Sequence, residues 1–93
     1  MIGLGLRAGK VVIGTGSVRR ELQRGGLVLV IVASDASQRT GEKVVRLAKA
    51  KRVPVVIGPD ASELGADLGR GSVQAVGVKD RHLASGVRRK LIL

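Results

Sequence analysis

Leu27-Val28-Leu29-Val30-Ile31-Val32-Ala33 is the stretch that decides the fold, because its seven apolar residues follow one another without alternation. A strand that faces water on one side alternates apolar and polar residues, whereas a strand covered on both faces does not. This run therefore predicts a strand at the centre of a sheet, with helices packed on both of its faces.

On the N-terminal side of this strand, the chain reads as a short helix, a strand and a second helix. Residues 2–8 predict the first helix, ending at Gly9, and Val11-Val12-Ile13 predicts a strand. Ser17 is a candidate N-cap for a helix that runs to Arg24, and Gly25-Gly26 stops that helix.

On the C-terminal side, helices and strands continue to alternate. The expected elements are a helix over 37–52, a second buried strand over 55–57, a helix over 62–68, a strand over 73–78 and a final helix from residue 80. Ser37, Ser62 and Asp80 are their candidate N-caps, and Leu83, Val87 and Leu91 would form the apolar face of the final helix. This order predicts one domain over residues 1–93, an α/β fold in the form of a three-layer α/β/α sandwich with a small mixed four-stranded sheet.

The charge balance points to a polyanionic partner. Seventeen Lys and Arg oppose seven Asp and Glu, which gives a formal net charge of +10 on 93 residues. The chain has no Phe, Tyr or Trp, so no base can stack on an aromatic ring. Any contact with RNA must then use charge, backbone N–H groups and arginine planes.

Other classes of function find little support. The chain has no Cys, and His82 is its single histidine, so we expect no metal site and no cofactor. Asp80, His82 and Ser85 are close in sequence, but helical spacing gives no reason to expect them to align as orienting group, base and nucleophile. No segment approaches the roughly 18 apolar residues of a membrane span, and the start lacks the apolar stretch of a signal peptide. We therefore expect a cytoplasmic protein that is not an enzyme, with no membrane partner and no small-molecule substrate.

The segment from Lys10 to Arg24 is the most informative, because a strand runs into a glycine turn that opens a helix. The first N–H groups of a helix have no partner inside it and carry partial positive charge, which suits phosphate. Glycine at 14 and 16 allows a phosphate or a base edge to approach the backbone. The candidate contact residues of this segment are Lys10, Gly14, Thr15, Gly16, Ser17, Arg19, Arg20 and Arg24. A solvated helix behind a glycine turn would show the same residue types.

The same turn also permits a dinucleotide-binding interpretation. Val-Val-Ile-Gly-Thr-Gly resembles the start of the nucleotide fingerprint, and Asp35 follows the next strand about 20 residues on. Against this hypothesis, Arg19 occupies the position where the third glycine would allow close packing.

Two further basic groups are left open. Arg39, Lys43, Arg46 and Lys49 lie on one predicted face of the long helix, opposite Val44, Val45 and Ala48. This stripe is either a solvated face or an extension of an RNA contact. The cations over 88–90 can serve as partners of a helix C-terminus.

The order of motifs along the chain resembles the L-seven-Ae / L-thirty-e ribosomal protein family, and within it the short bacterial members. The resemblance rests on Leu4 to Val11, Gly14, Leu29 to Ser37, Val53-Pro54-Val55, Glu63-Leu64-Gly65, Leu68-Gly69 and Val76 to Asp80. It implies an α/β/α sandwich that binds kink-turn or related structured RNA, as part of the ribosome, where it would serve translation, or of another ribonucleoprotein.

The resemblance also implies which residues would contact RNA. Family members read RNA from the strand–helix junction that Gly14 to Arg20 matches, and strong binders carry Asn and Glu where this chain has Gly16 and Ser17. A second family contact matches the loop from Gly69 to Val73, where Arg70, Ser72 and Val73 are the candidate residues. The departure at Gly16 and Ser17 leaves a second hypothesis open, a protein-interaction module that has lost specific RNA recognition.

Overall fold

The computed structural model describes residues 10–81 and 84–85, apart from the side chain of Asp67. The predicted helix over 2–8 and the residues Leu83, Val87 and Leu91 of the predicted final helix lie outside this range.

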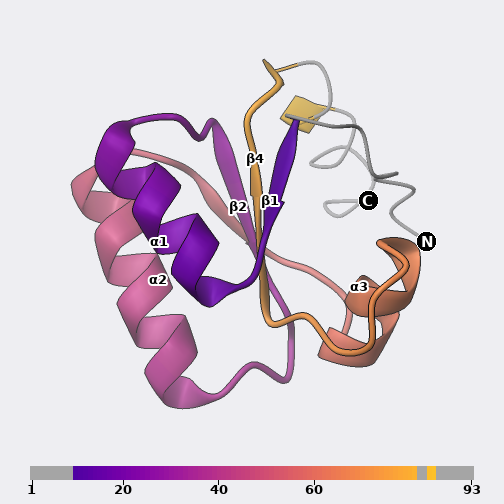
Figure 1. Cartoon of the computed structure of the whole chain (residues 1–93). Helices are drawn as coiled ribbons and strands as arrows, with labels where there is room; N and C mark the ends of the chain where they lie inside the picture. The colour runs from indigo at the N-terminus through magenta and orange to yellow at the C-terminus, as the bar shows by residue number, and fades with distance from the viewer. Residues whose placement is uncertain (1–9, 82–83, 86–93) are drawn as a thin grey trace.

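Strands and helices alternate along the described chain (Figure 1). In order they are β1 (Val11–Ile13), α1 (Thr15–Arg24), β2 (Leu29–Val32), α2 (Gln38–Ala50), β3 (Val55–Ile57), α3 (Ala61–Asp67) and β4 (Ala75–Val78). The sheet has four strands in the order β1-β4-β2-β3, with β4 antiparallel to β1 and β2, and with β3 parallel to β2. The predicted mixed four-stranded sheet is therefore confirmed.

The apolar run that contains β2 lies at the centre of the sheet, and its side chains pack into two separate cores. Val30 and Val32 contact the core beneath α1 and α2, while Leu29 and Ile31 contact the core beneath α3. Figure 1 shows α1 and α2 together on one face of the sheet and α3 on the other. The predicted three-layer sandwich is confirmed, and the reason is the one expected from the sequence, a strand buried on both faces.

The interpretation of Val55-Val56-Ile57 as a second buried strand was wrong. β3 is one of the two edge strands of the described sheet, its first two residues are half-buried, and Ile57 is 62% exposed. An apolar run of three residues does not distinguish an edge strand from a central one, because only the arrangement of the neighbouring strands decides that.

The predicted helix starts were correct at one position and wrong at two. The Ser37 hydroxyl caps α2 and accepts a hydrogen bond from the Thr40 N–H at 3.2 Å. Ser17 lies inside α1, whose N-cap is Gly14, and Asp60 rather than Ser62 caps α3. At the start of α1 the backbone of Gly14, rather than a capping side chain, makes the turn.

Strand direction gathers the helix starts at one end of the sheet. Since β4 is antiparallel to both β1 and β2, the C-terminal ends of β1, β2 and β3 lie beside the start of β4. Each of α1, α2 and α3 follows one of those strand ends, so all three helices begin at this end. Among the described residues, no helix has the length and apolar character needed to cross a membrane.

Candidate nucleic-acid interface

The turn between β1 and α1 is fixed by the backbone of Gly14. Its φ of 98° and ψ of 150° belong to a region that residues with a side chain rarely adopt. The Gly14 N–H donates to the Ala75 carbonyl at 2.9 Å, and the Gly14 carbonyl accepts from the Val18 N–H at 2.9 Å. The start of α1 is therefore tied to the start of β4.

Backbone N–H groups at the start of α1 are available to a ligand. Within the described chain, the N–H groups of Thr15, Gly16 and Ser17 donate no hydrogen bond, and no side chain caps the helix. Gly16 is exposed, and a Cβ built on it would meet nothing within 4 Å. This segment, Gly14 to Ser17, is called the glycine turn below. It combines unpaired donors, the positive end of a helix dipole and open space, which suits an anionic group such as phosphate.

Arg19 and Arg20 extend the positive charge of the glycine turn along α1. Val18 and Leu22 are fully buried and fix the rotation of the helix, so that both arginines stand on its exposed side. Neither arginine forms an ion pair with a described residue. Their guanidinium groups are free to contact a ligand that reaches the glycine turn.

Gln74 joins the glycine turn to the start of α2. The Gln74 carbonyl accepts from the Ala33 N–H at 2.9 Å, and its Oε1 accepts from the Ser37 N–H at 3.3 Å. The next residue, Ala75, holds Gly14. Gln74 is exposed and was not among the predicted contact residues. No motif marks it, because its position depends on the pairing of β4 with both β1 and β2.

The loop from Gly69 to Val73 folds back on α3 before it reaches Gln74. The Arg70 N–H donates to the Gly65 carbonyl at 2.7 Å, and the Val73 N–H donates to the Ala61 carbonyl at 3.0 Å. Arg70 and Ser72 are exposed, whereas the Val73 side chain is buried in the core beneath α3. The structure thus leads this loop to the glycine-turn end and leaves Arg70 and Ser72 as its accessible candidates.

Lys10 and Arg24 lie away from the glycine turn. Lys10 precedes β1, at the strand end farther from Gly14, and Arg24 is the last residue of α1. Both contact carboxylates: Lys10 Nζ lies 3.5 Å from Asp80 Oδ2, and an Arg24 guanidinium nitrogen lies 3.6 Å from Glu21 Oε1. The structure therefore does not bring these two predicted supporting residues together with Arg19 and Arg20.

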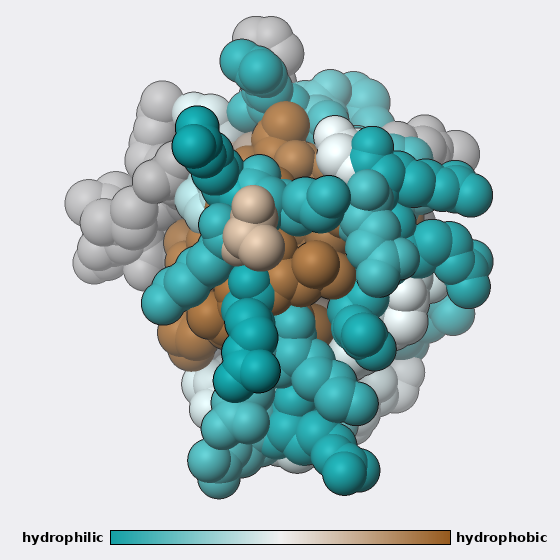
Figure 2. All heavy atoms as spheres, turned by 90° about the vertical axis from the view of Figure 1, so that its left-hand side faces the viewer, coloured by the Kyte–Doolittle hydropathy of each residue, from teal (hydrophilic) through white to brown (hydrophobic). Residues whose placement is uncertain are grey.

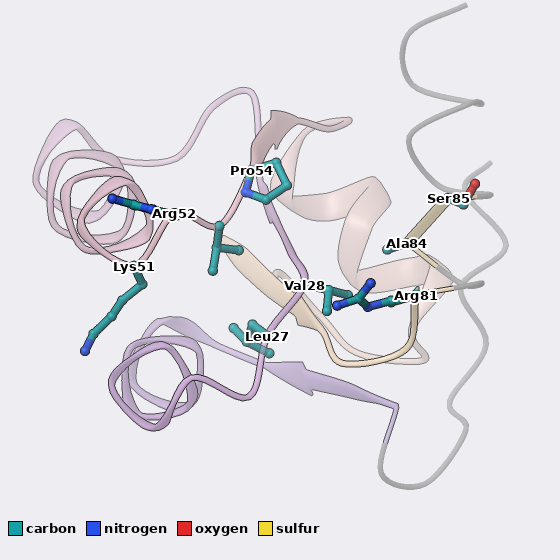
Figure 3. Close-up of a pocket in the computed structure, with 9 residues that line it drawn as sticks. Leu27, Val28, Lys51, Arg52, Pro54, Arg81, Ala84 and Ser85 are labelled. Carbon is teal, nitrogen blue, oxygen red and sulfur yellow. The ribbon is translucent and has the colours of Figure 1, made fainter.

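A hollow of about 580 Å³ lies where α1 and α2 end, and its lining includes Lys51, Arg52 and Arg81 (Figure 3). Figure 3 shows Arg81 beside Val28, while Lys51 and Arg52 extend from the end of α2. The last carbonyls of a helix carry partial negative charge, which cations in this position complement. This argument applies to Lys51 and Arg52, which follow the end of α2, and it does not extend to Arg81.

Other chemistry has no support in the described part of the chain. It contains no group of three His, Cys, Asp or Glu side chains that could hold a metal ion. The dinucleotide hypothesis fails on topology, because β4 lies antiparallel between β1 and β2, whereas the nucleotide-binding unit pairs those strands side by side.

The fold and the glycine turn together define a small α/β/α protein with a surface suited to phosphate groups. The chain belongs to the Ribosomal protein L7Ae/L30e/S12e/Gadd45 family, whose model matches residues 2–87, and this confirms the resemblance drawn from the sequence. Membership in this family also bears out the prediction that the protein is not an enzyme.

Individual relatives agree with the family. The chain is 32% identical over 85 residues to RNA-binding protein YlxQ of Bacillus subtilis, covering 91% of this chain and 85% of that one. It is 43% identical over 60 residues to RNA-binding protein YbxF of Geobacillus stearothermophilus, covering 64% and 73%. Its structure matches that of a Bacillus halodurans protein described as of unknown function, with a TM-score of 0.90, 28% identity and coverage of 99% and 95%.

Proposed function

We propose that this protein is a single-domain RNA-binding protein that contacts structured RNA through the glycine turn, Arg19 and Arg20. The observation that carries the proposal is that three N–H groups and two arginines lie at one helix start without a partner among the described residues. Phosphate is the group that such donors accommodate. Family membership and two relatives named as RNA-binding proteins support RNA as the source of that phosphate.

The target within this proposal is a kink-turn-like element, in ribosomal RNA or another ribonucleoprotein RNA. The basis is the family resemblance at the strand–helix junction, where Gly14 is kept and Arg20 supplies a cation. Gly16 and Ser17 replace the Asn and Glu that read base pairs in strong binders. We therefore expect backbone contacts to contribute more to the affinity here than base contacts.

A titration against three RNAs tests both levels of the proposal. The RNAs are a kink-turn, the same RNA without its tandem G·A pairs, and a plain duplex, each at two salt concentrations. A preference for the intact kink-turn supports the finer target. Equal, salt-sensitive binding to all three supports phosphate binding alone. Absence of binding near physiological salt would favour a protein-interaction module instead.

A matched pair of variants tests whether RNA contacts the protein near the glycine turn. Arg20→Ala and Arg24→Ala remove the same charge from the same helix, but only Arg20 stands near the glycine turn. Loss of one phosphate contact should lower affinity about fivefold at 0.15 M salt and reduce the salt slope by about one. Arg24→Ala should change affinity less than about twofold. Equal effects of the two variants would contradict the proposed site.

A further inference from the structure

A groove of about 440 Å³ runs between α1 and α2, outside the glycine turn. Arg19 lines it from α1, and Lys43 and Arg46 line it from α2. Figure 2 shows this face of the molecule, where long hydrophilic side chains surround a strip of apolar surface. The sequence could not tell whether the basic stripe of the long helix lies near the glycine turn, and the packing of α1 against α2 brings part of it beside Arg19.

Within the described part of the chain, no carboxylate forms an ion pair with the three cations of this groove. Arg19, Lys43 and Arg46 are exposed, and none forms an ion pair with a described residue. Glu42 is the single acid among the described lining residues, and its Oε1 accepts a hydrogen bond from Gln38 on the same helix at 3.1 Å. The formal charge of the lining is therefore positive.

The basic side chains of α2 form a path from the glycine-turn end into the groove. Arg39, Lys43 and Arg46 are spaced four and three residues apart, which places them on one helical face. At 1.5 Å per residue they span about 10 Å along the helix axis. A path of this length exceeds the distance between neighbouring phosphates of one strand, so it can contact more than one phosphate. Since α2 begins at the same end of the sheet as α1, the path starts at the end of the sheet where the glycine turn lies.

We propose that the groove between α1 and α2 binds the phosphate backbone of an RNA stem that flanks the element held at the glycine turn. The inference rests on the proposed RNA-binding function and adds a second contact surface to it. A nucleic-acid backbone fits better than an acidic peptide, because the path is long and basic and starts at the same end of the sheet as the glycine turn. Leu47 and Ala50 add apolar surface to the lining of the groove, and such surface suits the methylene stems of Lys and Arg side chains.

The test compares two RNAs and two double variants. One RNA contains only the kink-turn-like element, and the other carries the same element with both stems lengthened by about ten base pairs, one helical turn. Lys43→Gln/Arg46→Gln removes two groove cations. Lys49→Gln/Arg52→Gln is the matched control, since it also removes one Lys and one Arg three residues apart from exposed positions outside the groove lining.

For the long RNA we expect the groove variant to lower affinity about tenfold or more and to reduce the salt slope by about two. For the short RNA, and for the control variant with either RNA, we expect changes below about threefold. The melting temperature of both variants should stay close to that of the unchanged protein, because the four side chains are exposed.

Four results would overturn the inference. Equal losses for groove and control variants would indicate general electrostatic attraction, and equal losses with short and long RNA would place the groove within the primary contact. If the groove variant binds as tightly as the unchanged protein, the groove does not contact RNA, and the proposed function is unaffected. Failure of the unchanged protein to bind either RNA would instead overturn the proposed function, and the groove contact with it.

Discussion

Helix α1 begins and ends at a glycine with positive φ, Gly14 at 98° and Gly25 at 76°, and basic side chains flank both ends. At the start, three N–H groups and two arginines have no partner among the described residues. At the end, the Gly25 N–H donates to the Leu22 carbonyl at 3.1 Å, so the chain satisfies its own backbone.

The cations at the two ends of α1 also differ in whether they have a partner. Glu21, Arg24 and Lys79 form a cluster near the end of α1, in which the Glu21 carboxylate lies 3.6 Å from Arg24 and 3.7 Å from Lys79. Within the described chain, Arg19 and Arg20 face no such carboxylate. Similar residue types thus produce an electrostatically satisfied end and an unsatisfied one. Only the second is suited to a polyanion.

The largest expected effect comes from making the glycine turn resemble the satisfied end. Thr15→Glu places a carboxylate at the first residue of α1, four residues before Arg19, where it can pair with the guanidinium and occupy the free N–H groups. We expect affinity for structured RNA to fall at least about tenfold, with stability unchanged or raised by about 0.5 kcal/mol. Filter binding and thermal melting would check this. Thr15→Gln, of similar size but neutral, should retain most of the affinity, and an equal loss would point to shape instead of charge.

The substitution Gly16→Ala should have a smaller effect on RNA affinity, and it tests whether RNA approaches the backbone closely without changing any charge. Gly16→Ala adds one methyl group in the first turn of α1, where no protein atom lies within 4 Å. Alanine favours the helix over glycine, so unfolding should cost up to about 1 kcal/mol more. If a phosphate approaches the Gly16 N–H closely, affinity should still fall about three- to fivefold. Chemical denaturation and RNA titration on the same samples measure both quantities. Unchanged affinity would show that the ligand does not reach this part of the backbone.

The smallest effect is expected at the satisfied end. Glu21→Gln removes the carboxylate and frees Arg24 and Lys79. Partly exposed ion pairs contribute little, so the free energy of unfolding should drop by no more than about 1 kcal/mol. Affinity for a plain duplex should rise about twofold, with a slightly steeper salt dependence. If the affinity rose as much as it falls in Thr15→Glu, the two ends of α1 would contribute equally to RNA binding, and the proposed difference between them would be wrong.

Local sequence signals predicted helices and strands correctly where the residues themselves decide the structure. The unbroken apolar run at 27–33 predicted the central strand, and Ser37 predicted the start of α2. These signals failed where a neighbouring residue or a neighbouring strand decides where a helix begins or whether a strand is buried. Ser17 is a good capping residue, but the conformation of Gly14 starts α1 three residues earlier. Val55 to Ile57 is as apolar as a central strand, yet no further described strand pairs with it on its outer side.

By itself the sequence determined the layered α/β fold, the glycine turn that opens α1 and the strong excess of positive charge. The tertiary structure decided which cations remain available. Glu21 reaches Lys79, a residue 58 positions away, because β4 and α1 pack together. Arg19 meets Lys43 and Arg46 across one groove because α1 packs against α2. Ion pairs and surface grooves join residues that are distant in sequence, so their positions follow from packing and cannot be derived from local preference.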